Sequence, residues 1–121
     1  MQLASTVFVG LVAAAHLYFF VLESFLWNTP YGRKTFKMSQ EKADHTASLA
    51  KNQGLYNAFL AAGLIWALMP HEAAMAFQLK VFFLGCVVVA GIVGSITASR
   101  AILFVQALPA AIALGLVWAV G

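Results

Sequence analysis

Long apolar stretches separated by short polar segments dominate the pattern of this chain. Apolar residues fill positions 3–27, and a polar segment follows at 28–51. A second apolar stretch ends before Pro70, and apolar sequence then continues to the end of the chain, interrupted at Lys80 and Arg100. A hydrocarbon core of about 30 Å needs about 20 helical residues to cross it. The pattern therefore predicts four membrane-spanning helices, at about 3–27, 52–69, 74–98 and 101–120.

The polar segment 28–51 is expected to lie outside the membrane. A loop is predicted at 28–39, and Ser39 is suited to cap a following helix that carries Glu41 in its first turn. No proline follows until Pro70, so one helix is predicted from about 40 to 69. At 1.5 Å per residue its length is roughly 45 Å. Because that exceeds the membrane core, its first turns should extend into the cytoplasm.

Composition separates this chain from soluble proteins. Of its 121 residues, 63% are hydrophobic and 9% are charged, whereas soluble domains average about a quarter charged residues. A soluble chain this short could not bury so much apolar surface. We therefore expect a single all-α domain over residues 1–121, an integral membrane four-helix bundle with its second helix extended into the cytoplasm.

The basic residues predict the orientation. Six of the seven Lys and Arg residues lie in the first and third loops: Arg33, Lys34, Lys37, Lys42, Lys51 and Arg100. The positive-inside rule puts these loops in the cytoplasm, so both termini should lie on the outer, periplasmic side of the inner membrane. The net charge of +3 needs no nucleic-acid partner, because no basic face with interleaved aromatic residues is present.

Small residues recur every four positions in the third predicted span. Ala90, Gly94 and Ala98 form this series, which lets two helices approach closely. The neighbouring helix can belong to the same chain or to a second copy, and we expect a homo-oligomer. In the fourth span, Pro109 frees the carbonyl of Val105 and should bend the helix.

Polar side chains from several helices fall at one level in the cytoplasmic half of the membrane. Glu23 lies four residues inside Trp27, or roughly 6 Å. Asn57 and Gln106 each lie six residues inside the cytoplasmic boundary, or roughly 9 Å. A carboxylate is costly at membrane depth, at about 2.5–3.5 kcal/mol for a central position, so Glu23 should have a partner. The candidates are Asn57, Gln106, Gln53 and Arg100.

The spacing of these residues predicts which face they share. His16 and Glu23 are seven residues apart and lie on one side of their helix. Gln53, Tyr56 and Asn57 form one stripe of the next helix, which we expect to face protein or a water-filled cavity. No metal site is expected, because no paired-histidine motif is present. Cofactors cannot be inferred from these residues.

Several motifs resemble a known family. They are His16-Leu17-Tyr18 with Glu23 and Trp27, Thr29-Pro30-x-Gly32-Arg33, Lys51-Asn52-Gln53-Gly54-Leu55-Tyr56-Asn57, and Phe59-Leu60-Ala61-Ala62-Gly63. Together they resemble a bacterial and fungal family of small four-span membrane proteins that is catalogued as a domain of unknown function. The resemblance covers nearly the whole chain and implies the four-span fold, but it implies no activity.

A weaker, fold-level likeness is to the membrane-associated glutathione and eicosanoid enzymes, which also have four spans, outside termini and a second helix that extends into the cytoplasm. That likeness implies that Asn52, Gln53 and Arg100 would bind a thiol cofactor. The chain departs from the pattern, because those enzymes carry Glu three residues after an Asn and here Asn52 is followed by Leu55. Fold-level likeness alone does not carry function.

Three hypotheses follow for function. The first is a membrane-embedded enzyme that acts on a lipophilic or amphipathic small molecule. Its predicted catalytic residues are Glu23, His16 and Tyr56, and its predicted ligand-binding residues are Asn52, Gln53, Asn57, Gln106 and Arg100. The second is a small proton-coupled transporter that works as a dimer, and the third is a structural or assembly protein of the membrane.

Overall fold

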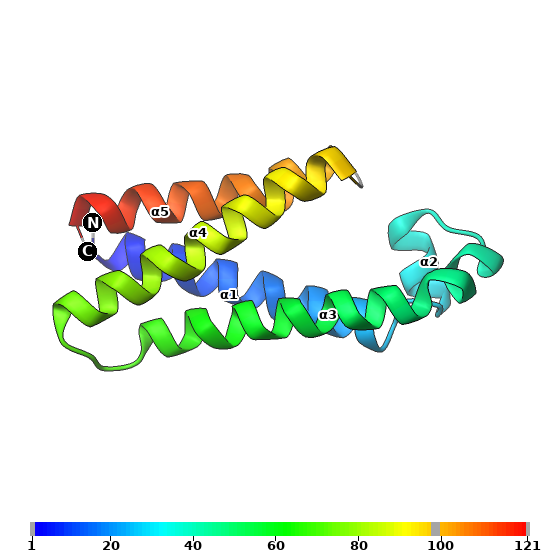
Figure 1. The fold of residues 1–121 in the computed structure, drawn as a ribbon, viewed down its shortest axis with the longest axis horizontal. Coiled ribbons are helices and arrows are strands. Elements are labelled where there is room, and N and C mark those ends of the chain that lie inside the picture. Colours follow the sequence, from blue (N-terminus) through cyan, green and yellow to red (C-terminus); the bar gives the residue numbers. More distant parts are fainter. Residues whose placement is uncertain (1, 98–99, 121) are drawn as a thin grey trace. The chain divides into compact units, whose positions relative to one another are not determined.

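A computed structural model describes residues 2–97 and 100–120, and this part of the chain is helical with no β-strand. The elements in chain order are α1 (Gln2–Ser24), α2 (Pro30–Phe36), α3 (Gln40–Leu68), α4 (Ala73–Thr97), the π-helical turn η1 (Leu103–Ala107) and α5 (Leu108–Val120) (Figure 1). The prediction of an all-α fold is therefore confirmed. The turn predicted around Arg100 includes residues 98 and 99, which lie outside the described residues, as does the Ala98 of the small-residue series.

The chain divides into two compact units, which are described separately. Unit 1 comprises Met1–Ala14 and Leu60–Gly121, and unit 2 comprises Ala15–Phe59. Both α1 and α3 contribute to each unit, whereas α2 belongs to unit 2 alone and α4, η1 and α5 belong to unit 1.

Aliphatic side chains from four helices form the core of unit 1. Its buried members are Val9, Val12, Ala13, Leu64, Leu84, Val87, Ala110, Ala113 and Val117. On α1, α4 and α5 they recur at three- and four-residue spacing, as expected of one face of a helix, and α3 contributes Leu64. The core of unit 1 is thus formed by side chains of the start of α1, the end of α3, α4 and α5.

The small residues of α4 allow a close approach to η1. A Cβ atom added to Gly91 would lie 2.6 Å from Ala107 Cβ and 2.7 Å from Ala107 N. One added to Gly94 would lie 3.0 Å from Ile102 Cγ2. The small-residue series therefore packs within the chain at Gly94, and the neighbouring Gly91 does so too.

The helix predicted over 101–120 begins irregularly. The N–H of Leu108 bonds to the carbonyl of Leu103, five residues back, which defines the π turn. Pro109 follows directly and has no N–H to donate to the carbonyl of Val105. Pro109 was expected to bend the helix, and the structure has a widened π turn directly before it.

Unit 2 corrects one prediction, because the segment 28–39 is not simply a loop. It contains α2, whose first turn is capped by the Thr29 side chain and starts with Pro30. Proline is favoured at this position because its fixed φ suits a helix and its missing N–H costs nothing there. Lys37 ends the helix in the left-handed conformation, at φ 54°. The following helix α3 matches the prediction for 40–69, and Ser39 Oγ accepts from the N–H of Lys42 at 3.1 Å.

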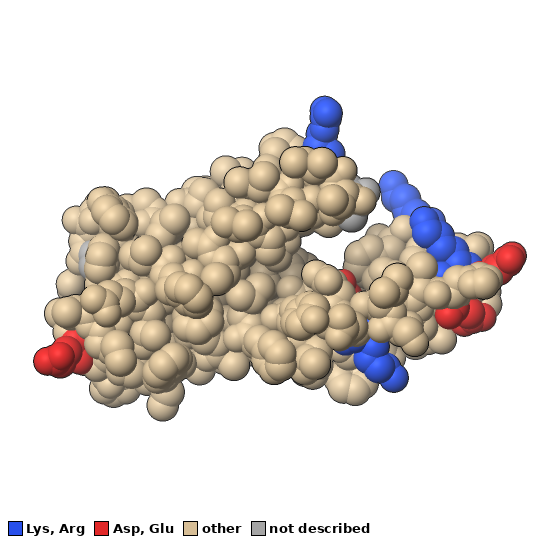
Figure 2. Space-filling view, viewed as in Figure 1, with Lys and Arg blue, Asp and Glu red and all other residues tan. Residues whose placement is uncertain are grey.

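Three segments are long and apolar enough to cross a membrane: Gln2–Ser24, Ala73–Thr97 and Leu103–Val120. The helix α3 is long enough but less apolar, because Lys51, Asn52, Gln53 and Asn57 dilute its hydropathy. On the face shown in Figure 2, Lys and Arg gather over α2 and the first turns of α3, with Asp and Glu beside them, whereas the helices of unit 1 show few charges. The helical membrane character is consistent with prediction, and the fourth crossing and the orientation stay predictions.

Candidate functional site

Within unit 2, α1 and α3 approach each other at Gly54. This glycine is buried, and a Cβ atom added to it would lie 3.2 Å from both Glu23 Cβ and Phe20 O and would overlap Ser24 Oγ. The two backbones are therefore as close here as a glycine allows. Gly54 was named above only as part of a motif, although a small residue amid polar ones could have marked a helix crossing.

One turn further along α3, Asn57 meets Glu23. The side-chain amide Nδ2 of Asn57 donates a hydrogen bond to Glu23 Oε1. Asn57 is buried at 6% exposure, and Glu23 is half-buried. Of the four candidate partners named for Glu23, the structure thus supplies Asn57.

The polar stripe expected on α3 does not form one buried face. Asn57 is buried, but Asn52 and Gln53 are exposed and Tyr56 is 51% exposed. Five buried positions of α3 instead recur at alternating four- and three-residue steps, at Ala50, Gly54, Asn57, Ala61 and Leu64, and Ala43, Gly63 and Ala67 are buried as well. Small and apolar residues, rather than polar ones, mark this face.

His16 lies on α1, with 1% of its surface exposed. Its ring meets the ring of Phe19 edge to face, at 5.3 Å between centroids. Seven residues of helix separate His16 from Glu23, or roughly 10 Å along the axis. A direct contact between the two side chains is therefore not expected, and a shared role would need a third group between them.

The other predicted ligand-binding residues belong to unit 1. Gln106 lies half-buried in η1, and Arg100 is exposed ahead of it. Because these residues and Glu23 lie in different units, their meeting with Glu23 stays a prediction. Among the described residues, no group of three or more His, Cys, Asp or Glu side chains is placed to hold a metal ion.

The segment that follows α1 is tied to both neighbouring helices of unit 2. Trp27 Nε1 donates to Thr46 Oγ1 of α3 at 3.0 Å, and the Trp27 ring packs on Phe36 of α2 at 4.7 Å between centroids. The hydroxyl groups of Tyr18 on α1 and Tyr31 on α2 are hydrogen-bonded to each other. These contacts order the corner between α1 and α3, close in sequence to Glu23.

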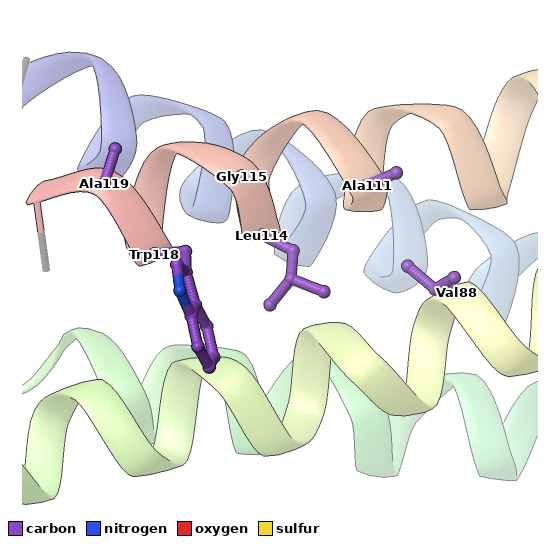
Figure 3. Close-up of a pocket in the computed structure, with 6 residues that line it drawn as sticks. All are labelled: Val88, Ala111, Leu114, Gly115, Trp118 and Ala119. Atoms are coloured by element: carbon purple, nitrogen blue, oxygen red, sulfur yellow. The ribbon is translucent and has the colours of Figure 1, made fainter.

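An apolar hollow of about 570 Å³ lies in unit 1. It is lined by Val88 of α4 and by Ala111, Leu114, Gly115, Trp118 and Ala119 of α5 (Figure 3). None of its lining residues titrates, so the hollow offers apolar contact and no acid–base chemistry. None of the predicted site residues lines it.

The Glu23–Asn57 pair is therefore the arrangement with the clearest chemistry. A carboxyl group can exchange a proton, and an amide can hydrogen-bond either protonation state. The amide donates to the carboxylate through Nδ2 and, after a half-turn, accepts from the protonated acid through Oδ1. The pair can thus stay satisfied whether Glu23 is charged or neutral, which an ion pair could not.

Comparison with known proteins agrees with the resemblance in the motifs. An uncharacterized protein, YpaA of Lactococcus lactis subsp. lactis (strain IL1403), is 29% identical over 98 residues, which cover 79% of this chain and 81% of that protein. No solved structure matches the chain significantly. The family model described as a protein of unknown function, DUF1304, matches residues 10–118. This match covers most of the chain, which therefore belongs to the DUF1304 family.

Proposed function

We propose that the protein crosses the inner membrane four times, with α3 as the second crossing and both termini on the periplasmic side. The proposal is supported by the three strongly apolar segments and by the basic residues on α2 and the start of α3. From Leu55 to Leu68, Asn57 is the α3 residue with an amide side chain, and it is buried. A helix whose amide is satisfied by protein can lie in lipid at moderate cost.

We further propose that the protein is a membrane-embedded enzyme that acts on a lipophilic or amphipathic small molecule. The single observation that carries this proposal is the hydrogen bond from Asn57 to Glu23. A half-buried acid near the cytoplasmic end of a membrane helix, partnered by a neutral amide, can accept and return a proton. Glu23 is the proposed general acid or base, and Asn57 is its positioning residue.

The remaining predicted residues have subsidiary roles in this proposal. His16, Gln106 and Arg100 would orient the substrate or stabilise an anionic group on it. Asn52, Gln53 and Tyr56 are exposed on α3, so they would contact a substrate that approaches from outside unit 2. The expected substrate has an apolar tail that lies among lipid chains and a polar group that reaches Glu23.

The test compares ligands that co-purify with two variants. The wild type, Glu23→Gln and the control Glu41→Gln are purified from native membranes in lipid, and bound small molecules are identified by mass spectrometry. Gln keeps a hydrogen-bonding group beside Asn57 but cannot titrate, whereas Glu41 is an exposed acid in the first turn of α3. We expect Glu23→Gln to retain substrate that the wild type and the control convert to product.

Two other functions would give different results. A dimeric proton-coupled transporter would move a solute across reconstituted liposomes, and Glu23→Gln would abolish the flux without any chemical change in the solute. A structural protein would bind no enriched molecule, and Glu23→Gln would change stability alone. Either result would rule out the proposed enzyme.

A further inference from the structure

The helix α2 is fixed against the end of α1. The Thr29 hydroxyl donates to the carbonyl of Leu26 at 2.6 Å and accepts from the N–H of Gly32 at 3.3 Å. Gly32 is buried, and a Cβ atom added to it would lie 2.6 Å from the carbonyl oxygen of Trp27 and would overlap that of Leu26. The first turn of α2 therefore packs directly on the backbone that leaves α1.

The Tyr18–Tyr31 hydrogen bond fixes the level of α2 relative to α1. Tyr18 lies six residues before Ser24, where α1 ends, or roughly 9 Å back along the helix. Because the Tyr31 hydroxyl of α2 meets that of Tyr18, α2 is held close to the last turns of α1. The helix α1 is one of the segments apolar enough to span a membrane, and if α1 crosses the bilayer, α2 would lie near the membrane surface. Both tyrosines are about half exposed, as is typical of the interfacial aromatic belt.

The exposed side of α2 is strongly basic. Lys34 lies three residues after Tyr31 and shares its face, and Lys37 follows at the end of the helix. Both lysines are exposed, as is the aromatic ring of Phe36 at 41%. The Nε atom of Arg33 is buried without a hydrogen-bond partner among the described residues, so the chain does not fully satisfy this guanidinium. No Asp or Glu occurs between positions 24 and 40.

We propose that α2 binds the headgroups of anionic phospholipids at the cytoplasmic surface of the membrane. Arg33, Lys34 and Lys37 would contact the lipid phosphates, and the Tyr18–Tyr31 pair would lie where headgroups meet acyl chains. A role in membrane topology alone requires only that enough positive charges are present. It does not require a helix that is held beside the end of α1. An acidic soluble partner would need the basic face to project from the membrane, which the link to Tyr18 opposes.

This inference goes beyond the proposed function, because it depends on α1 lying in the membrane and not on any reaction at Glu23. Its test measures lipid binding to the full chain in a neutral detergent. Removal of positive charges can invert the orientation of a protein in a membrane, and detergent avoids this complication. Native mass spectrometry compares phosphatidylglycerol with phosphatidylcholine of the same acyl chains. The variant Arg33→Gln/Lys34→Gln/Lys37→Gln is paired with Lys42→Gln/Lys51→Gln/Lys80→Gln, which removes the same charge elsewhere.

We expect the wild type and the control to bind phosphatidylglycerol more strongly than phosphatidylcholine. In the α2 variant the ratio of the two affinities should fall by at least about tenfold. Acetylation of the wild type provides a second measurement that needs no variant. Phosphatidylglycerol should protect Lys34 and Lys37 from acetylation but leave Lys42 and Lys51 reactive. Equal binding of the two lipids, equal losses in the two triple variants, or protection of Lys34 by inorganic phosphate alone would overturn the proposal.

Discussion

Asn57 donates its side-chain amide to Glu23 Oε1 and so joins the middle of α3 to the last turn of α1. The two residues are 34 positions apart in the chain, so this hydrogen bond depends on the fold and not on local sequence. It lies one helical turn beyond Gly54, where the absence of a side chain lets the two backbones approach closely. The crossing and the hydrogen bond should therefore be tested separately.

Replacing Asn57 with Ala should destabilise the protein by about 1–2 kcal/mol, because Glu23 loses its donor and a buried side chain is truncated. The free energy of unfolding in detergent measures this loss. The matched control is Asn52→Ala, which removes an exposed amide from the same helix and should stay within about 0.5 kcal/mol of the wild type. Equal effects of the two substitutions would mean that the hydrogen bond to Glu23 contributes no stability.

Replacing Gly54 with Ala should push α1 and α3 apart at Phe20 and Glu23. The added methyl group would overlap Ser24 Oγ and would lie 3.2 Å from both the carbonyl oxygen of Phe20 and the Cβ of Glu23, so these neighbours must shift, and overpacking of this kind costs about 1–3 kcal/mol. The control is Gly10→Ala, since a Cβ atom there meets nothing within 4 Å. Alanine is a better helix former than glycine by up to about 1 kcal/mol, so the control should be neutral or stabilising in the same unfolding assay. A stabilising effect of Gly54→Ala would show that the crossing is not tight.

The sequence was sufficient to predict some features. Helix α3 follows from Ser39 as its cap and from the absence of proline before Pro70. An acid at membrane depth must find a partner, and this cost predicted a set of candidates that includes Asn57. Both predictions rest on local chemistry or on a strong energetic penalty.

Other features could not be predicted from polarity. The stripe of Gln53, Tyr56 and Asn57 was expected to face protein or a water-filled cavity, and within the chain Asn57 alone of the three is buried. In water, apolar residues mark the buried side of a helix, but in lipid apolar side chains are equally stable outside. Residue size then becomes the better guide, as at Ala50 and Gly54, which are both buried.

Helix α2 was mistaken for a loop for a different reason. Proline and glycine, here Pro30 and Gly32, usually indicate turns, but a proline directly after Thr29 is also the start signal of a helix. Gly32 is needed for contact with the carbonyls of Leu26 and Trp27 rather than for a turn. Such a contact between segments cannot be inferred from composition alone.

The Trp27–Thr46 hydrogen bond should stabilise the corner between α1 and α3. Thr46→Val keeps the side-chain shape but leaves Trp27 Nε1 without its acceptor, and we expect a loss of about 1 kcal/mol in the free energy of unfolding. Thr46→Ser keeps the hydroxyl and should retain most of the stability. The control is Thr35→Val, because the Thr35 hydroxyl bonds only to the carbonyl of Tyr31 in its own helix. If both valine variants lose the same stability, the contact with Trp27 contributes nothing.

The two ends of α3 provide the sharpest test of the four-span proposal. Asp44 lies near its start and Glu72 just beyond its end, and both are exposed. If α3 crosses the membrane, a cysteine at position 44 should be cytoplasmic and one at position 72 periplasmic. Each is introduced as Asp44→Cys or Glu72→Cys in a background with Cys86→Ser, which removes the native thiol.

Intact cells treated with a membrane-impermeant maleimide should then label Glu72→Cys and not Asp44→Cys. After permeabilisation both variants should react, which shows that each thiol is accessible in the folded protein. The helix α3 is less apolar than the three other long segments, so the opposite result has a clear physical meaning. If both cysteines share one reactivity in intact cells, the pairing of Asn57 with Glu23 does not suffice to hold α3 across the bilayer, and the chain crosses the membrane an odd number of times.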